Sequence, residues 1–420
     1  MRVIADFHIH SKYARACSKD LNPANIGQWC GIKGIDLISV ADFTHPAWLA
    51  ELKRSLIEAE PGLYRLKKSS SPVRFICSTE ISSIYSQGGK VRRIHNLVFA
   101  PNLETVEKIN NKLEALDCNL KADGRPIIGL SSRELLETVL EANDQCFIIP
   151  AHAWTPWFAV FGSKSGFDSL SECFGEDLIQ YVPAVETGLS SDPPMNWRLK
   201  ELSSKNLISS SDAHSLANLG REATVFDLPS LSYDLVKQAL FNPMPAGGLL
   251  YTIEFFPEEG KYHYDGHAVC QVVLEPKETK RKKGICPKCG KLLTIGVAHR
   301  VEDIKDYDVK PENARDYRSI IPLMEILAEI MGVGKASKKV VERYEEIIKQ
   351  GGSEFTVLLD LSFEQLKTIG GELLAKAIIR MREGKVFTQP GYDGVYGVVK
   401  VWKPGELPDK KTAQQSLFGT

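Results

Sequence analysis

Asp6-Phe7-His8-Ile9-His10 is the stretch that decides the fold, because two histidines alternate with apolar residues directly after a strand-like run. Side chains alternate between the two faces of a strand, so both imidazoles point to one side and can reach a single metal ion. A second stretch, Ser209-Ser210-Ser211-Asp212-Ala213-His214, ends another apolar run and repeats the pattern with a carboxylate and an imidazole. These are ligands that zinc, manganese and iron accept. The two stretches together predict a metal site at strand ends.

Further candidate ligands stand beside other apolar runs. They are Asp42 after residues 36–41, Glu80 after residues 73–77, His95 before residues 96–99 and His152 after residues 146–151. Barrels and open α/β sheets build their active sites from side chains at strand ends. A lone His-x-His pair is a weak signal. Further metal-ligand residues beside other apolar runs make it a strong one.

This order of ligands resembles the polymerase-and-histidinol-phosphatase (PHP) superfamily over roughly the first half of the chain. The motifs that carry the resemblance are His8-x-His10, Glu80, His95, His152 and Asp212-x-His214. The resemblance implies an α/β fold, a distorted (β/α)7 PHP barrel, with a phosphoesterase site that holds two or three divalent metals (Zn, Mn, Mg or Fe). The second motif of the family has His directly after Asp, whereas Phe43 follows Asp42 here and His45 could substitute.

The resemblance also suggests how the ligands divide between ions. One ion would lie on His8, His10, Glu80 and Asp212, and the second on Glu80, His95 and His152. Asp42 and His214 would serve a third position. The same side chains are the candidate catalytic residues, namely His8, His10, Glu80, His95, His152, Asp212 and His214.

Length and composition bound the class of protein. A chain of 420 residues is too long for one ordinary core, which predicts two or three domains. Nine cysteines, an odd number, favour a reducing cytoplasm over a disulfide framework. The first strand begins too close to Met1 for a signal peptide, and no apolar run has membrane-spanning length. We therefore expect a cytoplasmic protein without a membrane partner. A net charge of −1 places any affinity for nucleic acid in local patches.

The pattern divides the chain into four parts. Residues 1–245 alternate short apolar runs with helical stretches, which predicts the metallophosphoesterase barrel. Residues 246–310 carry paired Cys and His positions, which predict a small zinc-binding module, a zinc ribbon. Residues 311–402 are helical. Residues 403–420 hold prolines and lysines without periodicity and predict a flexible tail.

Two short motifs predict one structural zinc ion. His267-x2-Cys270 and Cys286-x2-Cys289 are separated by fifteen residues, the two-knuckle spacing of such a site. His263 and His299 compete with His267 for the fourth ligand position. The basic segment 277–283 between the knuckles is either a solvated face or a contact for phosphates.

The helical part contains the pattern helix, Gly332-Val333-Gly334, helix, followed by Lys335. This pattern is typical of a helix-hairpin-helix unit, whose glycines let backbone amides approach a DNA phosphate. Gly332, Gly334 and Lys335 are therefore candidate DNA-binding residues. An ordinary helical hairpin with a glycine turn is the alternative.

The C-terminus, Gln414-Gln415-Ser416-Leu417-Phe418, resembles the peptide that bacterial proteins dock on the sliding clamp. On that resemblance Leu417 and Phe418 would fill an apolar pocket and Gln414 would hydrogen-bond beside it. A sliding clamp of the bacterial type is thus an expected partner.

The whole architecture resembles the endonuclease Q family of DNA-repair nucleases, including residues 186–197 and 286–291. The resemblance implies incision of damaged DNA 5′ to uracil, hypoxanthine, xanthine or an abasic site, leaving 3′-hydroxyl and 5′-phosphate ends. Because the lesion is a base, we expect it to leave the stack and enter a pocket. The candidate pocket residues are Glu186, Asn196, Trp154, Trp157 and Trp197.

Two other functions remain open on the sequence. A PHP-type phosphomonoesterase acting on a small phosphate ester would explain the barrel and leave the other parts without a role. A non-catalytic DNA-binding adaptor that delivers a partner to the clamp would explain those parts, but it would not need an intact set of metal ligands.

Overall fold

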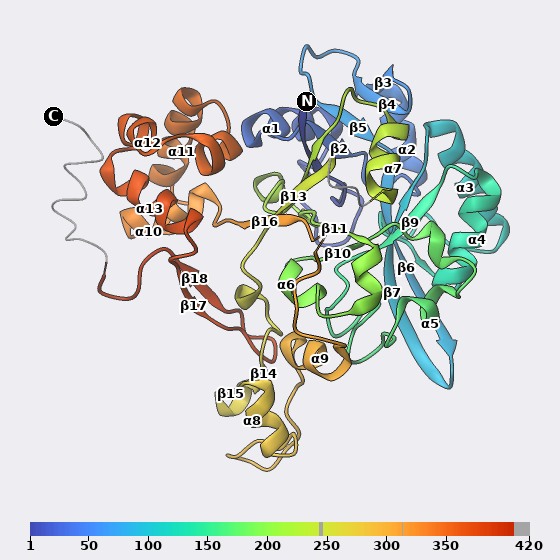
Figure 1. The fold of residues 1–420 in the computed structure, drawn as a ribbon. Coiled ribbons are helices and arrows are strands. Elements are labelled where there is room, and N and C mark those ends of the chain that lie inside the picture. The colour runs from blue at the N-terminus through green and yellow to red at the C-terminus, as the bar shows by residue number, and fades with distance from the viewer. Residues whose placement is uncertain (243–246, 313, 407–420) are drawn as a thin grey trace.

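A computed structural model describes residues 1–242, 247–312 and 314–406 (Figure 1). The largest sheet has the strand order β16-β13-β12-β1-β2-β5-β4-β3. Its strands are β1 (Arg2–Asp6), β2 (Leu37–Ser39), β3 (Leu56–Glu60), β4 (Leu63–Leu66), β5 (Arg74–Ile76), β12 (Ala223–Asp227), β13 (Gly248–Glu254) and β16 (Asp316–Ser319). β1 pairs in parallel with β2, and β2 with β5, whereas β12 runs antiparallel to β1.

Two smaller sheets complete the α/β part. One has the order β8-β6-β7-β9, and the other pairs β10 with β11 in parallel. Their strands are β6 (Ser78–Gln87), β7 (Lys90–Phe99), β8 (Ile127–Ile128), β9 (Phe147–Pro150), β10 (Ala184–Glu186) and β11 (Asn206–Ile208). The backbone pairing of these α/β strands is thus divided among three sheets, and a bridge between Ile9 and Ala213 links the ends of the first and third.

One core joins the three sheets. The large sheet contributes residues such as Phe226, the second sheet Phe99 and Phe147, and the third Ile208, all fully buried. Phe7 lies between two of them, with ring centroids 5.5 Å from Phe99 and 5.9 Å from Phe226 in edge-to-face geometry. The strands therefore wrap around a shared interior, which is the arrangement that a barrel needs, although their pairing is not one continuous ring.

Helices cover this core, and their ends follow from the sequence. They are α1 (Pro23–Lys33), α2 (Pro46–Ser55), α3 (Leu103–Ala115), α4 (Ser132–Ala142), α5 (Leu170–Phe174), α6 (Pro193–Asn196) and α7 (Tyr233–Phe241). α4 begins with a capping box in which Ser131 accepts from the N–H of Glu134 and the Glu134 carboxylate accepts in return. A Ser followed three residues later by Glu, as at Ser131 and Glu134, is the sequence signature of such a box.

The zinc module projects from the main body (Figure 1). It contains the hairpin of β14 (Asp265–His267) and β15 (Val272–Leu274), followed by α8 (Pro276–Arg281), and α9 (Val297–Ile304) leads back to the body. A small core of Val272, Leu274, Leu293 and Cys286 holds it together. The basic segment expected as a loop is partly helical, because Pro276 begins α8 and the following residues have good helix propensity.

The helical part consists of α10 (Leu323–Met331), α11 (Lys338–Gly351), a π-helical turn (Thr356–Asp360), α12 (Phe363–Gly370) and α13 (Glu372–Arg382). A short hairpin of β17 (Phe387–Gln389) and β18 (Val398–Lys400) follows. Gly332 ends α10 with a φ of 65°, the left-handed conformation that favours glycine. The helix ends and the capping box at Ser362 and Gln365 agree with the sequence.

The predicted boundaries at 245 and 310 differ from the sheet topology. β13 pairs with β12, and β16 pairs with β13, so residues 248–254 and 316–319 belong to the large sheet. The reason is that the free edge of β12 needs backbone partners, and a later segment supplies them. Local sequence patterns cannot show such long-range pairing. Of the apolar run 181–186, only Ala184–Glu186 form a strand. Among the described residues, the helices are all too short or too polar to cross a membrane.

Candidate metal centre

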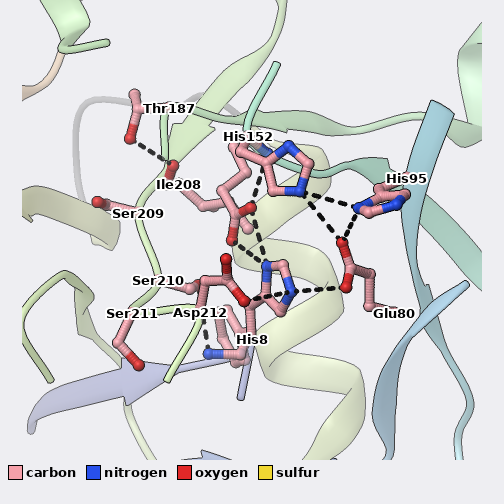
Figure 2. A network of polar contacts seen from close by, with 12 residues as sticks. His8, Glu80, His95, His152, Thr187, Ile208, Ser209, Ser210, Ser211 and Asp212 are labelled. Atoms are coloured by element: carbon pink, nitrogen blue, oxygen red, sulfur yellow. Dashed lines mark hydrogen bonds and ion pairs between the residues drawn. The ribbon is translucent and has the colours of Figure 1, made fainter. Parts of the chain in front are cut away.

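The predicted ligands meet where the three sheets come together. His8 and His10 follow β1, Glu80 lies on β6, and His95 lies on β7. Two more ligands follow strands: His152 comes after β9 and Asp212 after β11. Figure 2 shows His8, Glu80, His95, His152 and Asp212 converging on one small region. Glu80 and His95 stand within a long antiparallel hairpin rather than at strand ends, and the Gly88-Gly89 turn between its two strands is the sequence signal that could have identified it.

Two clusters have metal-binding geometry. In the first, ligand atoms of His8, His10, Glu80 and Asp212 all lie within 4.8 Å of one another. In the second, the same holds for Glu80, His95 and His152. These two sets coincide with the ligand sets expected from the sequence.

Glu80 belongs to both clusters and offers one oxygen to each. Its Oε2 lies 3.3 Å from Nε2 of His10, in the first cluster. Its Oε1 lies 2.5 Å from Nδ1 of His95 and 3.1 Å from Nε2 of His152, in the second. This is the position of a carboxylate that bridges two ions.

The histidines are oriented through their second ring nitrogens. Nδ1 of His8 lies 3.0 Å from Glu186, and Nδ1 of His10 lies 3.1 Å from Asp42. A carboxylate on one imidazole nitrogen fixes the ring and leaves the other free to bind a metal. Nε2 of His8 is buried without a hydrogen-bond partner, which fits an atom that awaits a ligand.

Asp42, which we expected at a third metal position, lies behind His10. Its Oδ1 faces His10, and its Oδ2 accepts from the N–H of Ser11 at 2.6 Å, so both oxygens are engaged. Asp42 therefore positions His10 and does not join either cluster. His45 packs against Tyr13 with ring centroids 4.4 Å apart, away from both clusters. His214 stands beside the first cluster, with its ring centroid 4.6 Å from that of His10.

The opposite charges in the site shift one another's pKa values. Burial alone would lower the pKa of His8, but the carboxylates of Glu186, Glu80 and Asp212 raise it well above its usual value. Burial would likewise raise the pKa of Glu80, and the cationic groups around it lower it well below the usual range. The clusters are thus rich in carboxylates, the partners that a divalent cation requires.

Two residues of the site have a strained backbone conformation. His152 has a φ of 30° and Asp212 a φ of 46°, both unusual for residues other than glycine. Two glycines make room at the site, one beside His152 and one beside Asp42. A Cβ on Gly188 would lie 2.5 Å from Cβ of His152, and one on Gly124 would lie 2.4 Å from Oδ2 of Asp42.

Sequence reasoning missed Arg125 and Phe158. Nη1 of Arg125 lies 3.0 Å from Oε2 of Glu80, and its side chain is 29% exposed, so the guanidinium stands at the open side of the site. The ring centroid of Phe158 lies 4.7 Å from that of His95. A single Arg in a turn and a Phe in a loop carry no pattern that would have identified them.

The structure corrects three of the predicted base-pocket residues. Glu186, Asn196 and Trp154 are all at most 1% exposed. Glu186 holds His8, and Oδ1 of Asn196 accepts from Nε1 of Trp154 at 2.7 Å. These side chains are used inside the fold, so they have no surface to offer to a base.

The two remaining tryptophans lie nearer the surface. Trp157 is 36% exposed, and its ring packs edge-on against Tyr262. Trp197 packs against Tyr317, with Lys310 over its ring. Trp157 directly precedes Phe158, whose ring packs against His95 of the second cluster.

The zinc motifs also come together. Ligand atoms of His267, Cys270, Cys286 and Cys289 lie within 4.8 Å of one another. The competing histidines are elsewhere, because His299 pairs with Asp265 at 2.5 Å and His263 stacks on Tyr264. His267 is therefore the fourth member of this cluster.

The candidate DNA-binding residues lie in the turn between α10 and α11. A Cβ on Gly334 would meet nothing within 4 Å, so its backbone is open to approach. The side chain of Lys335 is 62% exposed, and its Nζ lies 2.6 Å from Oε1 of Glu325. Gln414, Leu417 and Phe418 lie outside the described residues.

Comparisons of the sequence found relatives in archaea and bacteria. The family model of the MJ0043 C-terminal domain matches residues 322–385. Protein MJ0043 of Methanocaldococcus jannaschii is 30% identical over 264 residues, which cover 61% of this chain and 32% of that protein. This chain therefore spans about a third of the length of that relative. Protein YqxK of Bacillus subtilis is 29% identical over 379 residues, covering 88% of this chain and 89% of YqxK.

Two solved structures are similar over nearly their whole length. The lesion-specific endonuclease PfuEndoQ from Pyrococcus furiosus has a TM-score of 0.84 at 29% identity, covering 95% of both chains. Endonuclease Q in complex with a 27-mer duplex substrate, with an abasic lesion at its active site, also has a TM-score of 0.84. That structure is 30% identical and is covered over 98% of its chain, with 97% of this chain matched. On this similarity in sequence and structure, the chain belongs to the endonuclease Q family.

Proposed function

We propose that this protein is a DNA-repair endonuclease that hydrolyses the phosphodiester 5′ to a deaminated base or an abasic site. The products would carry 3′-hydroxyl and 5′-phosphate ends. The observation that carries the proposal is Glu80, whose two oxygens face two separate ligand clusters. Such paired sites are typical of enzymes that displace an oxygen from phosphorus in line. The complex of the relative with abasic DNA supports DNA as the substrate.

The donor set fits two divalent ions, one on each cluster. Ions bound there would lower the pKa of a water molecule and neutralise the charge of the scissile phosphate. Glu186 and Asp42 hold the rings of His8 and His10 so that each presents Nε2 to the first cluster. The protein thereby fixes the ligands before the substrate arrives, which removes the cost of ordering them during the reaction.

Arg125 would contribute to binding the phosphate group. Its guanidinium is bonded to Glu80 and partly exposed, so its remaining N–H groups face the opening of the site. Guanidinium forms paired hydrogen bonds with phosphate oxygens. Trp157, exposed beside the second cluster, is our candidate to stack on an extruded base.

The other parts of the chain would bind DNA outside the active site, support the fold and dock the protein on a partner. The open backbone around Gly332 and Gly334 and the exposed Lys335 would contact DNA phosphates without reading sequence. The zinc cluster has four protein ligands and no open position, so we assign it a structural role. Gln414, Leu417 and Phe418 would dock the protein on a sliding clamp.

The decisive experiment uses end-labelled duplex DNA with one central deoxyuridine, deoxyinosine or abasic site, incubated with Mg²⁺, Mn²⁺ or Zn²⁺. We expect a single cut 5′ to the lesion and no cut in undamaged duplex. Glu80→Gln, which removes the bridging charge, should abolish the cut, whereas Glu275→Gln on the exposed zinc module should leave it intact. Ligation of the 5′ product would verify its 3′-hydroxyl end. Uncut DNA with every metal, together with turnover of a small phosphate ester, would replace this proposal with the phosphomonoesterase function.

A further inference from the structure

A cavity rich in charged groups lies outside the metal centre, between the β6–β7 hairpin, the loop that precedes α5 and the helix α9. The loop 162–166, Gly-Ser-Lys-Ser-Gly, forms one wall of the cavity. Lys90 and Arg92 of β7 form a second wall, and Arg300 of α9 a third. The volume of about 330 Å³ lies within the range of small-molecule sites. None of these side chains has a role in the reaction proposed above.

Two polar atoms of the cavity wall are buried and have no hydrogen-bond partner among the described residues. They are Nε of Arg92 and Oγ of Ser163. The guanidinium of Arg92 is fixed by its other contacts, because Nη1 donates to the carbonyl of Gly166 and the group lies 4.0 Å from the ring centroid of Phe167. A buried donor without a partner is costly, so a bound group that accepts from these atoms would stabilise the fold.

The charges around the cavity favour an anion. The lining contains four cations, Lys90, Arg92, Lys164 and Arg300, and two carboxylates, Asp168 and Glu172. Asp168 is already paired with Arg300 at 2.6 Å, and Glu172 accepts from the backbone N–H of Asp168 at 3.2 Å. Within the described parts of the chain, neither lysine forms an ion pair. Part of the positive charge is therefore uncompensated.

A phosphate group matches these donors. Guanidinium, ammonium and hydroxyl groups converge from three walls, and a tetrahedral phosphate can accept from all three, which a planar carboxylate cannot. The loop is tight because of its glycines. A Cβ on Gly162 would lie 2.5 Å from the carbonyl oxygen of Thr155, and one on Gly166 would lie 2.4 Å from the backbone nitrogen of Gly162. Tight glycine turns of this kind recur in anion sites.

The cavity is separate from the metal centre but mechanically linked to it. Side chains alternate along β7, so Arg92 points to the face opposite that of His95. The hairpin that carries both residues extends beyond the body (Figure 1). The link is the loop, because the backbone N–H of Phe158 donates to Oγ of Ser165 at 3.3 Å and the ring of Phe158 packs on that of His95.

We propose that this cavity binds a phosphate group, with Arg92, Ser163 and Lys164 as its main ligands and Lys90 and Arg300 adding charge. The same group is present in a free phosphorylated molecule and in the backbone of DNA, and the experiment below distinguishes these two sources. Occupation of the cavity holds the loop 162–166 in place and, through it, the contact between Phe158 and His95. The inference goes beyond the proposed function and does not depend on it.

The test measures binding of inorganic phosphate to the full-length, zinc-loaded protein by calorimetry. The metal centre can also accept phosphate, so binding is measured in the Glu80→Gln background, which weakens that second site. Adding Ser163→Ala and Lys164→Gln should weaken phosphate binding about tenfold, the loss expected for one hydrogen bond to a charged group. Lys200→Gln with Ser204→Ala, at two exposed positions, is the matched control and should bind phosphate like its parent.

A lesion duplex distinguishes the two sources of the phosphate group. If the duplex displaces phosphate from the Glu80→Gln protein, the ligand is a backbone phosphate of DNA. If duplex and phosphate bind together, the ligand is a free phosphorylated molecule. Either result supports the site, provided that the cavity variant loses phosphate binding.

Two outcomes would overturn the inference: no saturable phosphate binding in the Glu80→Gln protein, or binding that the cavity variant retains within twofold. Thermal unfolding verifies the fold of each variant, and Lys164→Gln alone, at an exposed side chain, is a milder change with the same expected direction. A wild type that binds phosphate in the cavity but does not incise lesion DNA would refute the proposed function and leave this inference standing.

Discussion

Oε2 of Glu186 lies 3.0 Å from Nδ1 of His8 in the buried interior of the site. The same oxygen accepts a hydrogen bond from the backbone N–H of His152 at 2.8 Å, so one carboxylate holds a ligand of each cluster. Glu186→Gln keeps the size of the side chain but weakens its hold on the imidazole. We expect metal affinity to fall about 10- to 100-fold, as for other carboxylates behind ligating histidines.

Metal titration followed by incision at saturating metal would check this prediction. Activity that returns at high metal concentration would agree with a positioning role. A loss of lesion discrimination at unchanged metal affinity would contradict it and return Glu186 to the base pocket.

The affinity of the first cluster for metal should rise with pH. The surrounding carboxylates raise the pKa of His8 and His10 well above the usual value, against the effect of burial, which favours the protonated rings before an ion binds. A bound ion requires neutral imidazole, and protons must therefore leave when it binds. Calorimetry in two buffers of different ionisation enthalpy would measure proton release between about pH 6 and about pH 8. Metal binding without proton release would contradict the prediction.

Glu254→Gln should stabilise the protein increasingly as pH rises. Burial raises the pKa of Glu254 from 4.5 to about 8, so the folded state holds a proton that the unfolded state has lost. Stability of the wild type therefore falls between about pH 4.5 and about pH 8, and Gln, neutral throughout, avoids the loss. Gln also retains an oxygen that can accept from Thr187 and Ser209.

Thermal unfolding at both ends of this pH window would measure the difference. Glu275→Gln, on the exposed surface, provides the matched control. A gain for Glu254→Gln that is equal at both pH values would contradict the prediction.

Cys286→Ser should remove zinc and unfold the module while the barrel remains folded. Cys286 is both a member of the zinc cluster and part of the small module core, and few other residues are buried there. Structural zinc supplies much of the folding free energy of such modules. We expect loss of one zinc per chain and new protease cleavage near residues 265–295, with little change in the main unfolding transition. Cys118→Ser, in a cysteine outside the cluster, should retain the metal.

Lys33→Met should loosen the helical part from the barrel. Nζ of Lys33 on α1 lies 2.6 Å from Glu354, and both side chains are 5% exposed. Glu354 also accepts from the Tyr344 hydroxyl at 2.7 Å and from the backbone N–H of Leu323 at 2.9 Å, so the substitution would leave a buried carboxylate with neutral partners only. Removing one member of a buried pair costs roughly 3–5 kcal/mol. Arg2→Gln, which breaks a half-exposed pair with Asp360, should cost at most about 1 kcal/mol in urea unfolding.

The elements that the sequence predicted best are those with local causes. The capping boxes at Ser131 and Ser362 and the glycine end of α10 depend on residues within a few positions of one another. The zinc cluster was equally predictable from the sequence, because two short motifs contain its four residues. The pairing of β13 and β16 with the large sheet was not predictable, since it joins segments that are distant along the chain.

The sequence by itself indicated which side chains could bind metal, and their division into two groups was a hypothesis that the two clusters match. Ligand chemistry resides in residue type, and strand alternation sorts neighbours such as His8 and His10 onto one face. Only the tertiary structure decided the roles of acids that carry the same charge. Glu80 lies in both clusters, whereas Asp42 and Glu186 each face the Nδ1 atom of a histidine, because these positions depend on which ring nitrogens each carboxylate reaches in the folded chain. Burial in the fold also decided against a base-binding role for Asn196 and Trp154, because their side chains have no exposed surface.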